Sequence, residues 1–369
     1  MAIKEKKILI LTSEFPPQPG GIGQHALDLA KQLEKRHQVI VIADQRSNDG
    51  VEELNFDADL DFKVIRIKRL DKIAFTYAFR LKETLNHLSK VDLVMTSGKF
   101  SLWQIHMIKL RFPSKPVIAI IHGSEVLLPS KITKKLTDRA LEKADCVVAV
   151  SHYTQSLVNH LKIKSMKVIP NGITNIPDYK KNVIDSNEIH LLTVGNLTQR
   201  KGQHNVIEAL PLILKEFPQV HYHCVGLPTN LEQLQELAEK LQVSEAVTFH
   251  GRLSERDKQK FYENSHIFLM LSERTESGDV EGFGIAILEA NANGLPAIGS
   301  SGSGIEDAIK SGHSGYLVNP HDKNDIVEAL RNILKDYPSF EKQSYTWSKS
   351  FKWEVLIQDY HQLLKHLCA

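Results

Sequence analysis

The sequence has few cysteines and no long apolar segment. Of its 369 residues only three are cysteine, Cys146, Cys224 and Cys368, and none belongs to a C-x-x-C pair. Such spacing argues against a disulfide framework and a zinc site, and it favours a reducing compartment. The first apolar stretch, Ile8 to Thr12, is too short for a signal-peptide core, and no run reaches membrane-spanning length. These absences predict a cytoplasmic protein.

The charge is nearly balanced over the chain but not within it. The net charge is +2, yet residues 1–170 carry 27 Lys and Arg against 18 Asp and Glu, and the remainder carries 19 against 26. A hydrophobic content of 42% is that of an ordinary globular protein, and the length allows two domains. A basic half joined to an acidic half predicts different partners for the two domains.

Basic residues gather in two groups in the first half. We interpret them either as a solvated face or as a surface that attracts an anionic acceptor or anionic lipid headgroups. Nucleic acid is not expected, because no recognised binding motif accompanies the charge. Two overlapping D-x-D triplets at 57–61 are interpreted as solvated loop charge rather than a metal site. The basic groups are Lys63, Arg66, Lys68, Arg69 and Lys72, and Lys131, Lys134, Lys135 and Arg139.

Short β-rich runs alternate with helical patterns along the whole chain, which predicts an α/β protein with parallel sheets covered by helices. The cycle restarts after a polar stretch, 175–187, that we interpret as a linker between two Rossmann-like units. The tail from Ser344 is predicted to be helical and too apolar to be free. The predicted strands are 7–11, 39–43, 63–67, 93–96, 117–121, 146–150 and 167–169, then 190–194, 221–225, 247–250, 267–270, 297–299 and 316–318.

The segment Glu281-Gly-Phe-Gly-Ile-Ala-Ile-Leu-Glu289 is the most informative in the chain. Gly282 and Gly284 allow a close backbone approach or a positive φ. The run Ile285 to Asn293 is predicted to be a helix, so Glu281 lies at its N-terminal mouth, where the helix dipole favours anions. Glu289 lies two turns deeper on a nearby face.

The first loop is rich in proline and glycine, and Gly20, Gly21 and Gly23 precede a predicted helix. Such a loop can offer backbone N–H groups to a phosphate. A dinucleotide site is the rival, because Gly21 and Gly23 fit its fingerprint and Asp44 stands where a ribose-binding acid belongs. The rival fails on spacing, since residues 13–19 separate the strand from the first glycine.

Two further sites follow strands directly. His122 ends a buried strand in the sequence H-G-S-E, at the edge where ligands of open α/β sheets bind. Arg200 and Lys201 follow the first strand of the second domain and precede Gly202. A bidentate guanidinium, an ammonium and a close backbone approach suit a diphosphate.

Three smaller signals complete the pattern. Ser151 is interpreted as a helix cap, and Asn171-Gly172 as a turn with positive φ that leaves the first domain. The glycine-rich turn at 301–306 is predicted to touch a donor phosphate or sugar through backbone N–H groups, Gly304 among them. Arg274 and Asp279 lie on the loop that leads to Glu281.

The chain resembles the retaining glycosyltransferases of family 4, which have the GT-B fold. The resemblance implies two Rossmann-like domains facing across a cleft. Residues 1–172 would bind the acceptor and 173–350 the nucleotide-sugar donor, with a C-terminal helix, 351–369, crossing back to the first domain. The motifs that carry the resemblance, in order, are S-E-F-P-P-x-x-G-G-x-G, H-G-x-E, S-x-x-T, P-N-G-I, V-G-N-L-x-x-R-K-G, E-G-F-G-I-x-x-L-E-A, G-L-P and S-G-Y-L-V.

The resemblance also implies roles for single residues. Arg200 and Lys201 would bind the donor diphosphate, and Glu289 would hold both ribose hydroxyls. Glu281 would contact the donor sugar near its anomeric carbon, and His122 would hydrogen-bond that sugar. The resemblance would assign catalysis to Glu281, His122, Arg200 and Lys201. Donor contacts would come from Gly20, Gly21, Gly282, Phe283, Gly284 and, in addition, Gly195, Arg274, Ile285 and Gly304. The turn at 301–307 departs from the family's G-G-x-P-E pattern.

The stretch 274–281 looks most like the branch that uses GDP-mannose, which includes phosphatidylinositol mannosyltransferases. The resemblance therefore implies transfer of mannose, with retention, to a hydroxyl of a glycan or lipid-linked acceptor. No cofactor and no metal is expected, because two cations would neutralise the leaving group. The protein could bind peripherally to the inner face of an anionic membrane. The alternatives are a UDP-sugar-dependent glycosyltransferase, a nucleotide-sugar epimerase or phosphorylase of the same fold, and a non-catalytic sugar-nucleotide-binding protein.

Overall fold

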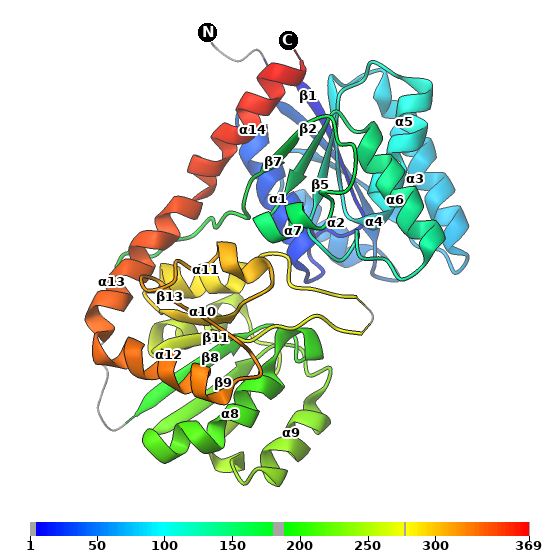
Figure 1. Cartoon of the computed structure of the whole chain (residues 1–369). Coiled ribbons are helices and arrows are strands. Elements are labelled where there is room, and N and C mark those ends of the chain that lie inside the picture. Colours follow the sequence, from blue (N-terminus) through cyan, green and yellow to red (C-terminus); the bar gives the residue numbers. More distant parts are fainter. Residues whose placement is uncertain (1–4, 180–187, 277, 369) are drawn as a thin grey trace. The chain divides into compact units, whose positions relative to one another are not determined.

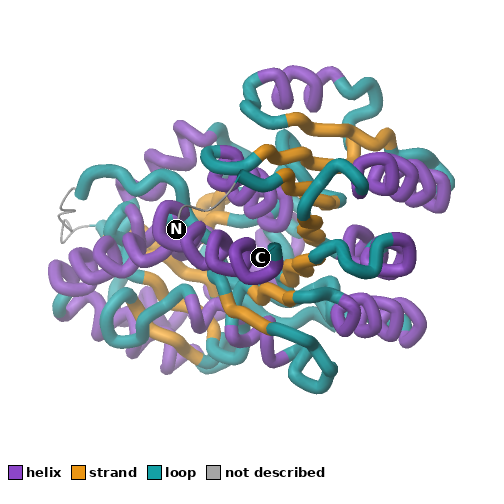
Figure 2. The backbone as a smooth tube through the Cα atoms, turned by 90° about the horizontal axis from the view of Figure 1, so that it is seen from above, coloured by secondary structure: helices purple, strands orange, loops and turns teal. Residues whose placement is uncertain are grey.

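A computed structural model describes residues 5–179, 188–276 and 278–368. The chain divides into two compact units, here called unit 1 (1–174 and 353–369) and unit 2 (175–352). Most of the predicted linker, 180–187, lies outside the described residues. In each unit the strands lie between layers of helices, which Figure 1 shows by element and Figure 2 by secondary structure.

Unit 1 contains a seven-stranded sheet in the order β3-β2-β1-β4-β5-β6-β7, with every pairing parallel. Because β1 pairs with both β2 and β4, the strand order reverses there, and ligands of open α/β sheets bind at such a switch point. The strands are β1 Lys7–Thr12, β2 Gln38–Gln45, β3 Lys63–Lys68, β4 Leu93–Ser97, β5 Val117–Ile121, β6 Cys146–Ala149 and β7 Met166–Val168.

The helices of unit 1 cover this sheet, and the last helix of the chain, α14 Trp353–Leu367, lies against α1 Gly21–Glu34. The ring of Trp353 packs so closely on Gly172 that a Cβ there would lie 2.7 Å from it. The other helices are α2 Val51–Ala58, α3 Ile73–Leu88, α4 Lys99–Trp103, α5 Ile105–Arg111, α6 Lys131–Lys143 and α7 His152–Ser156.

Unit 2 contains a six-stranded parallel sheet in the order β10-β9-β8-β11-β12-β13. Its switch point lies between β8 and β11, so the loops that follow these two strands are placed for ligand binding. The strands are β8 Ile189–Val194, β9 Val220–Val225, β10 Val247–Phe249, β11 Ile267–Met270, β12 Ala297–Ser300 and β13 Gly315–Val318.

Two of the α-helices of unit 2 begin with a side-chain N-cap. Ser254 accepts the N–H of Asp257 at the start of α10, and Asp322 accepts two N–H groups at the start of α12. The helices are α8 Gln203–Glu216, α9 Leu231–Lys240, α10 Glu255–Asn264, α11 Ile285–Ala292, α12 Lys323–Lys335 and α13 Tyr337–Ser348, with short 3₁₀ turns at Gln199–Lys201, Ser244–Ala246, Gly304–Asp307 and Lys349–Phe351.

The sequence predictions of the fold are confirmed at the level of elements. Each of the thirteen predicted strands is present, with ends that differ by at most two residues. The helix predicted from Ile285 is present, and Ser151 caps α7 by accepting the N–H of Thr154. The predicted positive φ at Asn171-Gly172 is wrong, because neither residue has one. The glycine is needed instead for its contact with Trp353.

Two predictions about surface charge also need correction. Asp57 is not loop charge, because it lies in α2 and accepts two hydrogen bonds from Arg66, at 2.7 and 2.9 Å. Arg66, in turn, is not part of a solvated basic face, since its side chain is only 11% exposed. Asp59 and Asp61 are exposed, as predicted.

Candidate functional site

Two loops of unit 2 meet at its switch point. The first follows β8 and ends at Gly202, and the second follows β11 and begins at Leu271. A Cβ on Gly202 would lie 1.8 Å from the carbonyl oxygen of Leu271, and the φ of this glycine is +72°, so only glycine permits the approach. The Glu273 N–H also donates to the Arg200 carbonyl (3.1 Å), and the Asn205 amide donates to that of Leu271 (3.0 Å). The basic end of the first loop is thereby held against the second.

The two cations of the first loop are paired with carboxylates of the second. Arg200 donates to Glu281 Oε2, and Lys201 Nζ lies 2.8 Å from the same oxygen. Arg200 Nε lies 3.1 Å from Asp279 Oδ2. Gly195 makes room for the stem of Lys201, since a Cβ there would lie 3.2 Å from Lys201 Cε. The protein thus holds two cations and two carboxylates in one cluster, which we call the cation cluster.

Glu281 is ionised within this cluster although its side chain is only 11% exposed. Burial alone would raise its pKa, but the attraction of Lys201 and Arg200 and their hydrogen bonds outweigh burial and hold the pKa at about 2. A diphosphate that binds here meets two oriented cations and competes with Glu281 for them.

The segment after Glu281 is fixed from two sides. Phe283 is 1% exposed, so its side chain belongs to the core and only its backbone can face a ligand. Gly284 has a φ of +87° and leads into Ile285, the first residue of α11. On the other side the Gly304 N–H donates to the Glu281 carbonyl (3.0 Å), and a Cβ on Gly304 would lie 2.0 Å from the carbonyl oxygen of Gly282. Gly304 therefore holds the loop in place, and its N–H is already used.

Glu289 lies further along α11 with its carboxylate partly exposed. Its Oε2 accepts a hydrogen bond from the Tyr262 hydroxyl (2.7 Å), and Lys258 Nζ lies 3.9 Å from it. Its backbone carbonyl accepts from the side-chain amide of Asn293 (2.9 Å). Arg274, also predicted as a donor contact, is exposed on the second loop.

In unit 1 His122 follows β5 and is 8% exposed. Its Nε2 lies 3.0 Å from the Ser97 hydroxyl at the end of β4, and the ring of His25 stands edge-on to it at 5.0 Å. The His25 Nε2 lies 3.4 Å from the Tyr360 hydroxyl of α14. Burial lowers the pKa of His25 to about 4 and, together with His25, holds the pKa of His122 well below its usual range. Both rings are therefore neutral at pH 7.

Glu125 holds the turn that follows His122. Its Oε1 accepts the His122 N–H, and its Oε2 is buried without a hydrogen-bond partner among the described residues. Gly123, inside the turn, has a φ of +121°. Burial raises the pKa of Glu125 to about 7, and nearby Glu14 adds to the rise. Hydrogen bonds from the backbone N–H groups of His122, Gly123 and Glu125 act in the opposite direction but are outweighed.

The glycines of the first loop differ in their surroundings. Gly20 and Gly21 are exposed where α1 begins. A Cβ on Gly20 would lie 3.0 Å from Glu14 Oε2, whereas one on Gly21 would meet nothing within 4 Å. Gly23 packs on the backbone of Phe15, and a Cβ on this glycine would lie 3.0 Å from the Phe15 nitrogen. The predicted phosphate-facing glycines are thus open to solvent, and Gly23 is the one that the packing requires.

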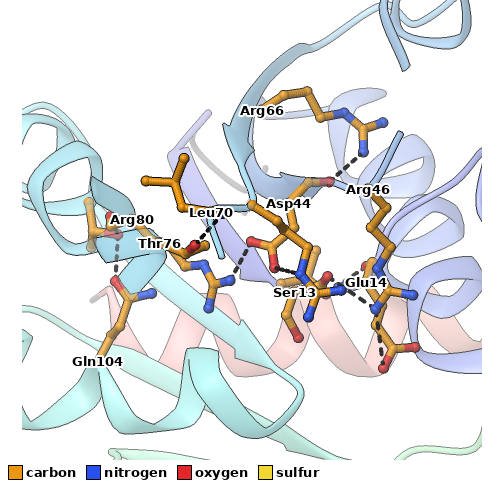
Figure 3. A network of polar contacts seen from close by, with 12 residues as sticks. Ser13, Glu14, Asp44, Arg46, Arg66, Leu70, Thr76, Arg80 and Gln104 are labelled. Atoms are coloured by element: carbon orange, nitrogen blue, oxygen red, sulfur yellow. Dashed lines mark hydrogen bonds and ion pairs between the residues drawn. The ribbon is translucent and has the colours of Figure 1, made fainter. Parts of the chain in front are cut away.

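Asp44, the acid that the dinucleotide rival needs, is already engaged. It is 3% exposed and forms an ion pair with Arg80 of α3, which is 1% exposed (Figure 3). The Arg66 side chain donates to the Asp44 carbonyl (3.3 Å), and Arg46 lies 3.8 Å from Glu14 in the same network. Breaking a buried ion pair costs about 3–5 kcal/mol. Asp44 is therefore a structural group, which argues further against a dinucleotide site.

Sequence reasoning missed three polar side chains that support these groups: Tyr262, Ser97 and His25. Tyr262 and His25 look like ordinary members of amphipathic helices, and Ser97 ends a strand without a motif. Only the neighbouring strand order would have paired Ser97 with His122, because β4 and β5 are adjacent and both end at this edge.

Two family models match the chain, one over each unit. Residues 19–174 match the model described as Glycosyltransferase Family 4, and residues 176–349 match the model described as Glycosyl transferases group 1. The chain belongs to the glycosyltransferases that these two domain models describe. It is therefore a glycosyltransferase with two Rossmann-like units of the GT-B type.

Curated relatives match most of the chain at low identity. A GDP-mannose-dependent alpha-(1-6)-phosphatidylinositol monomannoside mannosyltransferase from Mycolicibacterium smegmatis is 26% identical over 89% of this chain and 89% of its own. A GDP-mannose-dependent monoacylated alpha-(1-6)-phosphatidylinositol monomannoside mannosyltransferase from Corynebacterium glutamicum is 27% identical over 90% of this chain and 89% of its own. An alpha-monoglucosyldiacylglycerol synthase from Streptococcus pneumoniae is 23% identical over 92% and 80%.

Solved structures share the fold. HepE from Anabaena, solved with UDP-glucose, has a TM-score of 0.80 at 20% identity, and the match covers 98% of this chain and 100% of that one. Sucrose-phosphate synthase from Thermosynechococcus elongatus has a TM-score of 0.81 at 19% identity, and the match covers 98% of this chain and 99% of that one.

The described residues contain no group of three or more His, Cys, Asp or Glu side chains arranged to hold a metal ion. None of the helices within the described ranges is both long and apolar enough to cross a membrane.

Proposed function

We propose that the chain transfers mannose from GDP-mannose to a hydroxyl of a glycan or lipid-linked acceptor, with retention at the anomeric carbon. The observation that carries the proposal is the convergence of Arg200 and Lys201 on Glu281 at the switch point of unit 2. A guanidinium and an ammonium so placed suit a diphosphate leaving group. The choice of GDP-mannose is supported by the activities named for the mycobacterial and corynebacterial relatives.

In the proposed reaction the acceptor hydroxyl oxygen bonds to the anomeric carbon as the bond from that carbon to the β-phosphate oxygen breaks. The hydroxyl proton passes to the departing phosphate oxygen on the same face, so that configuration is retained and no dedicated base is needed. Arg200 and Lys201 stabilise the charge that develops on the leaving diphosphate, which is the electrostatic term that usually dominates. These two cations are the reason that we propose a reaction without a metal ion or other cofactor.

We propose the remaining roles from the resemblance, and the positions of the side chains support them. Glu289 presents a carboxylate to the ribose hydroxyls, and Glu281, ionised beside the cations, faces the sugar near its anomeric carbon. His122 is neutral, so it can donate or accept one hydrogen bond with the transferred sugar. Gly20 and Gly21, exposed at the start of α1, offer backbone N–H groups to the donor. Backbone groups of Gly282, Phe283, Gly284 and Ile285 line the mouth of α11.

A panel of nucleotide sugars tests the donor. The purified chain, given GDP-mannose, GDP-glucose, UDP-glucose or UDP-galactose, should release nucleoside diphosphate fastest from GDP-mannose. Faster release from a UDP-sugar would support the UDP-dependent alternative. Interconversion of free sugar nucleotides without transfer would support an epimerase. Binding of a donor with no release, even with acceptor extracts, would support a non-catalytic binding protein.

Metal independence has its own test. Initial rates with GDP-mannose should be unchanged after exhaustive treatment with EDTA, because the cation cluster itself supplies two positive charges. A rate that falls with EDTA and recovers on addition of Mg²⁺ or Mn²⁺ would contradict this part of the proposal.

We also propose peripheral contact with an anionic membrane through α3. Phe75 and Phe79 are 55% and 51% exposed on this helix, and Ile73 is 41% exposed. Lys72, the residue just before this helix, and Lys82, on the helix itself, are both exposed. Exposed aromatic side chains flanked by lysines suit a bilayer interface with anionic headgroups.

Flotation with liposomes tests this contact. The chain should float with vesicles that contain phosphatidylglycerol and not with pure phosphatidylcholine, and a Phe75→Ser/Phe79→Ser variant should lose flotation. Val355→Ser, which removes a 53% exposed apolar residue from α14, is the matched control and should still float. A wild-type chain that stays in solution at low salt would contradict the proposal.

A further inference from the structure

The hydroxyl of Tyr262 donates a hydrogen bond to Glu289 Oε2 at 2.7 Å. The two residues come from different helices of unit 2, α10 and α11, so the bond fixes the carboxylate relative to the neighbouring helix. Tyr262 is 1% exposed, whereas the Glu289 side chain is 36% exposed. Tyr262 is therefore packed in the core, whereas the carboxylate of Glu289 is partly open to solvent.

The surroundings of Tyr262 make its hydroxyl a hydrogen-bond donor to Glu289. Burial, with Glu289 adding to the effect, raises the pKa of the phenol well above its usual value, so the hydroxyl keeps its proton. The ring packs near Phe268 of β11, with the centroids 6.3 Å apart. Lys258 lies 3.9 Å from Glu289 but only 2.7 Å from Glu255, so it is shared between two carboxylates.

A carboxylate on a helix surface ordinarily samples several rotamers, and freezing them costs free energy when a ligand binds. The Tyr262 hydrogen bond occupies one lone pair of Oε2 and sets the plane of the carboxylate. The other lone pairs of Glu289 remain for further donors, because an ionised carboxylate offers about four acceptor sites.

We infer that Tyr262 is a positioning residue for nucleotide recognition, and that it orients Glu289 for the two ribose hydroxyls of the donor. This inference rests on the proposed function, which assigns the ribose to Glu289. The recognised group is a cis-diol on a ribonucleoside diphosphate. A nucleotide that lacks one of these hydroxyls should gain little from the orientation of Glu289.

Calorimetric titration with ribo and 2′-deoxy ligands separates positioning from general stability. The wild-type chain is titrated with GDP, UDP and their 2′-deoxy counterparts, and the pair that it binds more tightly is carried to the variants. Tyr262→Phe should weaken binding of the ribonucleotide about tenfold, which corresponds to one charge-assisted hydrogen bond. Binding of the 2′-deoxynucleotide should change by less than about twofold, so the preference for ribose shrinks.

Tyr222→Phe provides a matched control in the same unit. Tyr222 is fully buried in β9, and its hydroxyl donates to Thr193 Oγ1 at 2.7 Å, so the substitution removes a hydrogen bond of equal length away from Glu289. The preference for ribose should persist in this variant.

The outcomes distinguish two failures. An equal loss of affinity for both nucleotides in Tyr262→Phe, or the same loss of preference in Tyr222→Phe, overturns the inference and leaves the proposed function intact. No binding of GDP or UDP by the wild-type chain contradicts the proposed function itself and, with it, the inference.

Discussion

Lys201 Nζ lies 2.8 Å from Glu281 Oε2, and Arg200 donates to that same oxygen. The two cations that suit a diphosphate are therefore both paired with a carboxylate of the protein itself. This pairing offsets the repulsion between two positive charges that are only 25% and 14% exposed. In the proposed function a donor diphosphate would replace Glu281 as their partner, so that binding of the ligand would release this carboxylate.

Replacing Glu281 by Gln should separate binding from chemistry. The change removes the charge that competes for Arg200 and Lys201, so GDP should bind as tightly as in the wild type or several-fold more tightly. Transfer should fall about 100-fold, because the carboxylate that faces the developing positive charge on the sugar is lost. Calorimetry with GDP and initial rates with GDP-mannose measure the two effects.

Lys201→Met is the companion variant, since it retains the apolar stem over Gly195 and loses only the charge. GDP affinity and turnover should both fall. If Glu281→Gln instead weakened GDP as strongly as Lys201→Met, Glu281 would not be a competitor of the diphosphate.

Gly202→Ala should destabilise unit 2 strongly. A Cβ at this position would lie 1.8 Å from the Leu271 carbonyl oxygen and would also have to adopt a φ of +72°. We expect a loss of more than about 3 kcal/mol in the free energy of unfolding, since backbone and not a flexible side chain must move.

Gly251→Ala isolates the cost of φ alone. Gly251 has a φ of +66°, and a Cβ there meets nothing within 4 Å. Its loss should be about 1–2 kcal/mol. Urea unfolding of both variants measures the difference, and equal losses would mean that the contact between the two loops contributes nothing.

Glu125→Gln should stabilise the protein at alkaline pH. The folded pKa of about 7 lies above the ordinary value of 4.5, so the folded chain retains a proton that the unfolded chain has lost. This carboxyl therefore favours the folded state at low pH, and the benefit disappears as pH rises from 4.5 through 7. Glutamine stays neutral and can still accept the His122 N–H.

The variant should gain up to about 3 kcal/mol over the wild type at pH 8, relative to pH 5, in urea unfolding. Ser124, beside Glu125 in the turn, gives a control: Ser124→Ala should shift stability equally at both pH values. A pH-independent difference for Glu125→Gln would show that the carboxyl does not titrate between these limits.

Five histidines of unit 2 predict acid sensitivity. Their rings form one connected group, the histidine cluster, made of His190, His221, His223, His250 and His266. His190 Nδ1 lies 3.0 Å from His223 Nε2, and His223 Nδ1 lies 3.1 Å from His250 Nε2. Burial lowers the pKa of His223 to about 3 and that of His266 to about 4, with neighbouring histidines adding to the effect.

The folded chain therefore binds fewer protons than the unfolded chain below pH 6.5, and stability falls as pH drops from 6.5 towards 4. The loss of melting temperature between pH 7.5 and 5.5 should be smaller for His223→Gln than for the wild type. His313→Gln, at an exposed position outside the cluster, should behave like the wild type. An unchanged pH response in His223→Gln would contradict this role.

Local patterns were sufficient to predict the elements of the fold. The strands alternate with helices in stretches whose hydrophobic periodicity is readable within a few residues, and both sheets follow from that order. Long-range contacts were not readable. Gly172 must be small because Trp353, far along the chain, packs on it. Arg66 forms an ion pair with Asp57 and is only 11% exposed.

The candidate site shows the same limit. Sequence motifs pointed to Arg200, Lys201 and Glu281, because each stands near a glycine at the end of a strand or the start of a helix, and to Glu289 by its spacing from Glu281. They did not predict that Glu281 neutralises both cations, since that depends on the packing of Gly202 on Leu271. They did not find Tyr262, which looks like a core aromatic but whose hydroxyl donates to Glu289.

The most direct test of the cation cluster compares GDP with guanosine by calorimetry. The wild-type chain should bind GDP at least about 100-fold more tightly than guanosine, because two charge-assisted contacts to phosphate contribute about 1.5–3 kcal/mol each. An Arg200→Gln/Lys201→Met variant should bind the two ligands almost equally. A double variant that still binds GDP as tightly as the wild type would contradict the assignment of this cluster to the donor diphosphate.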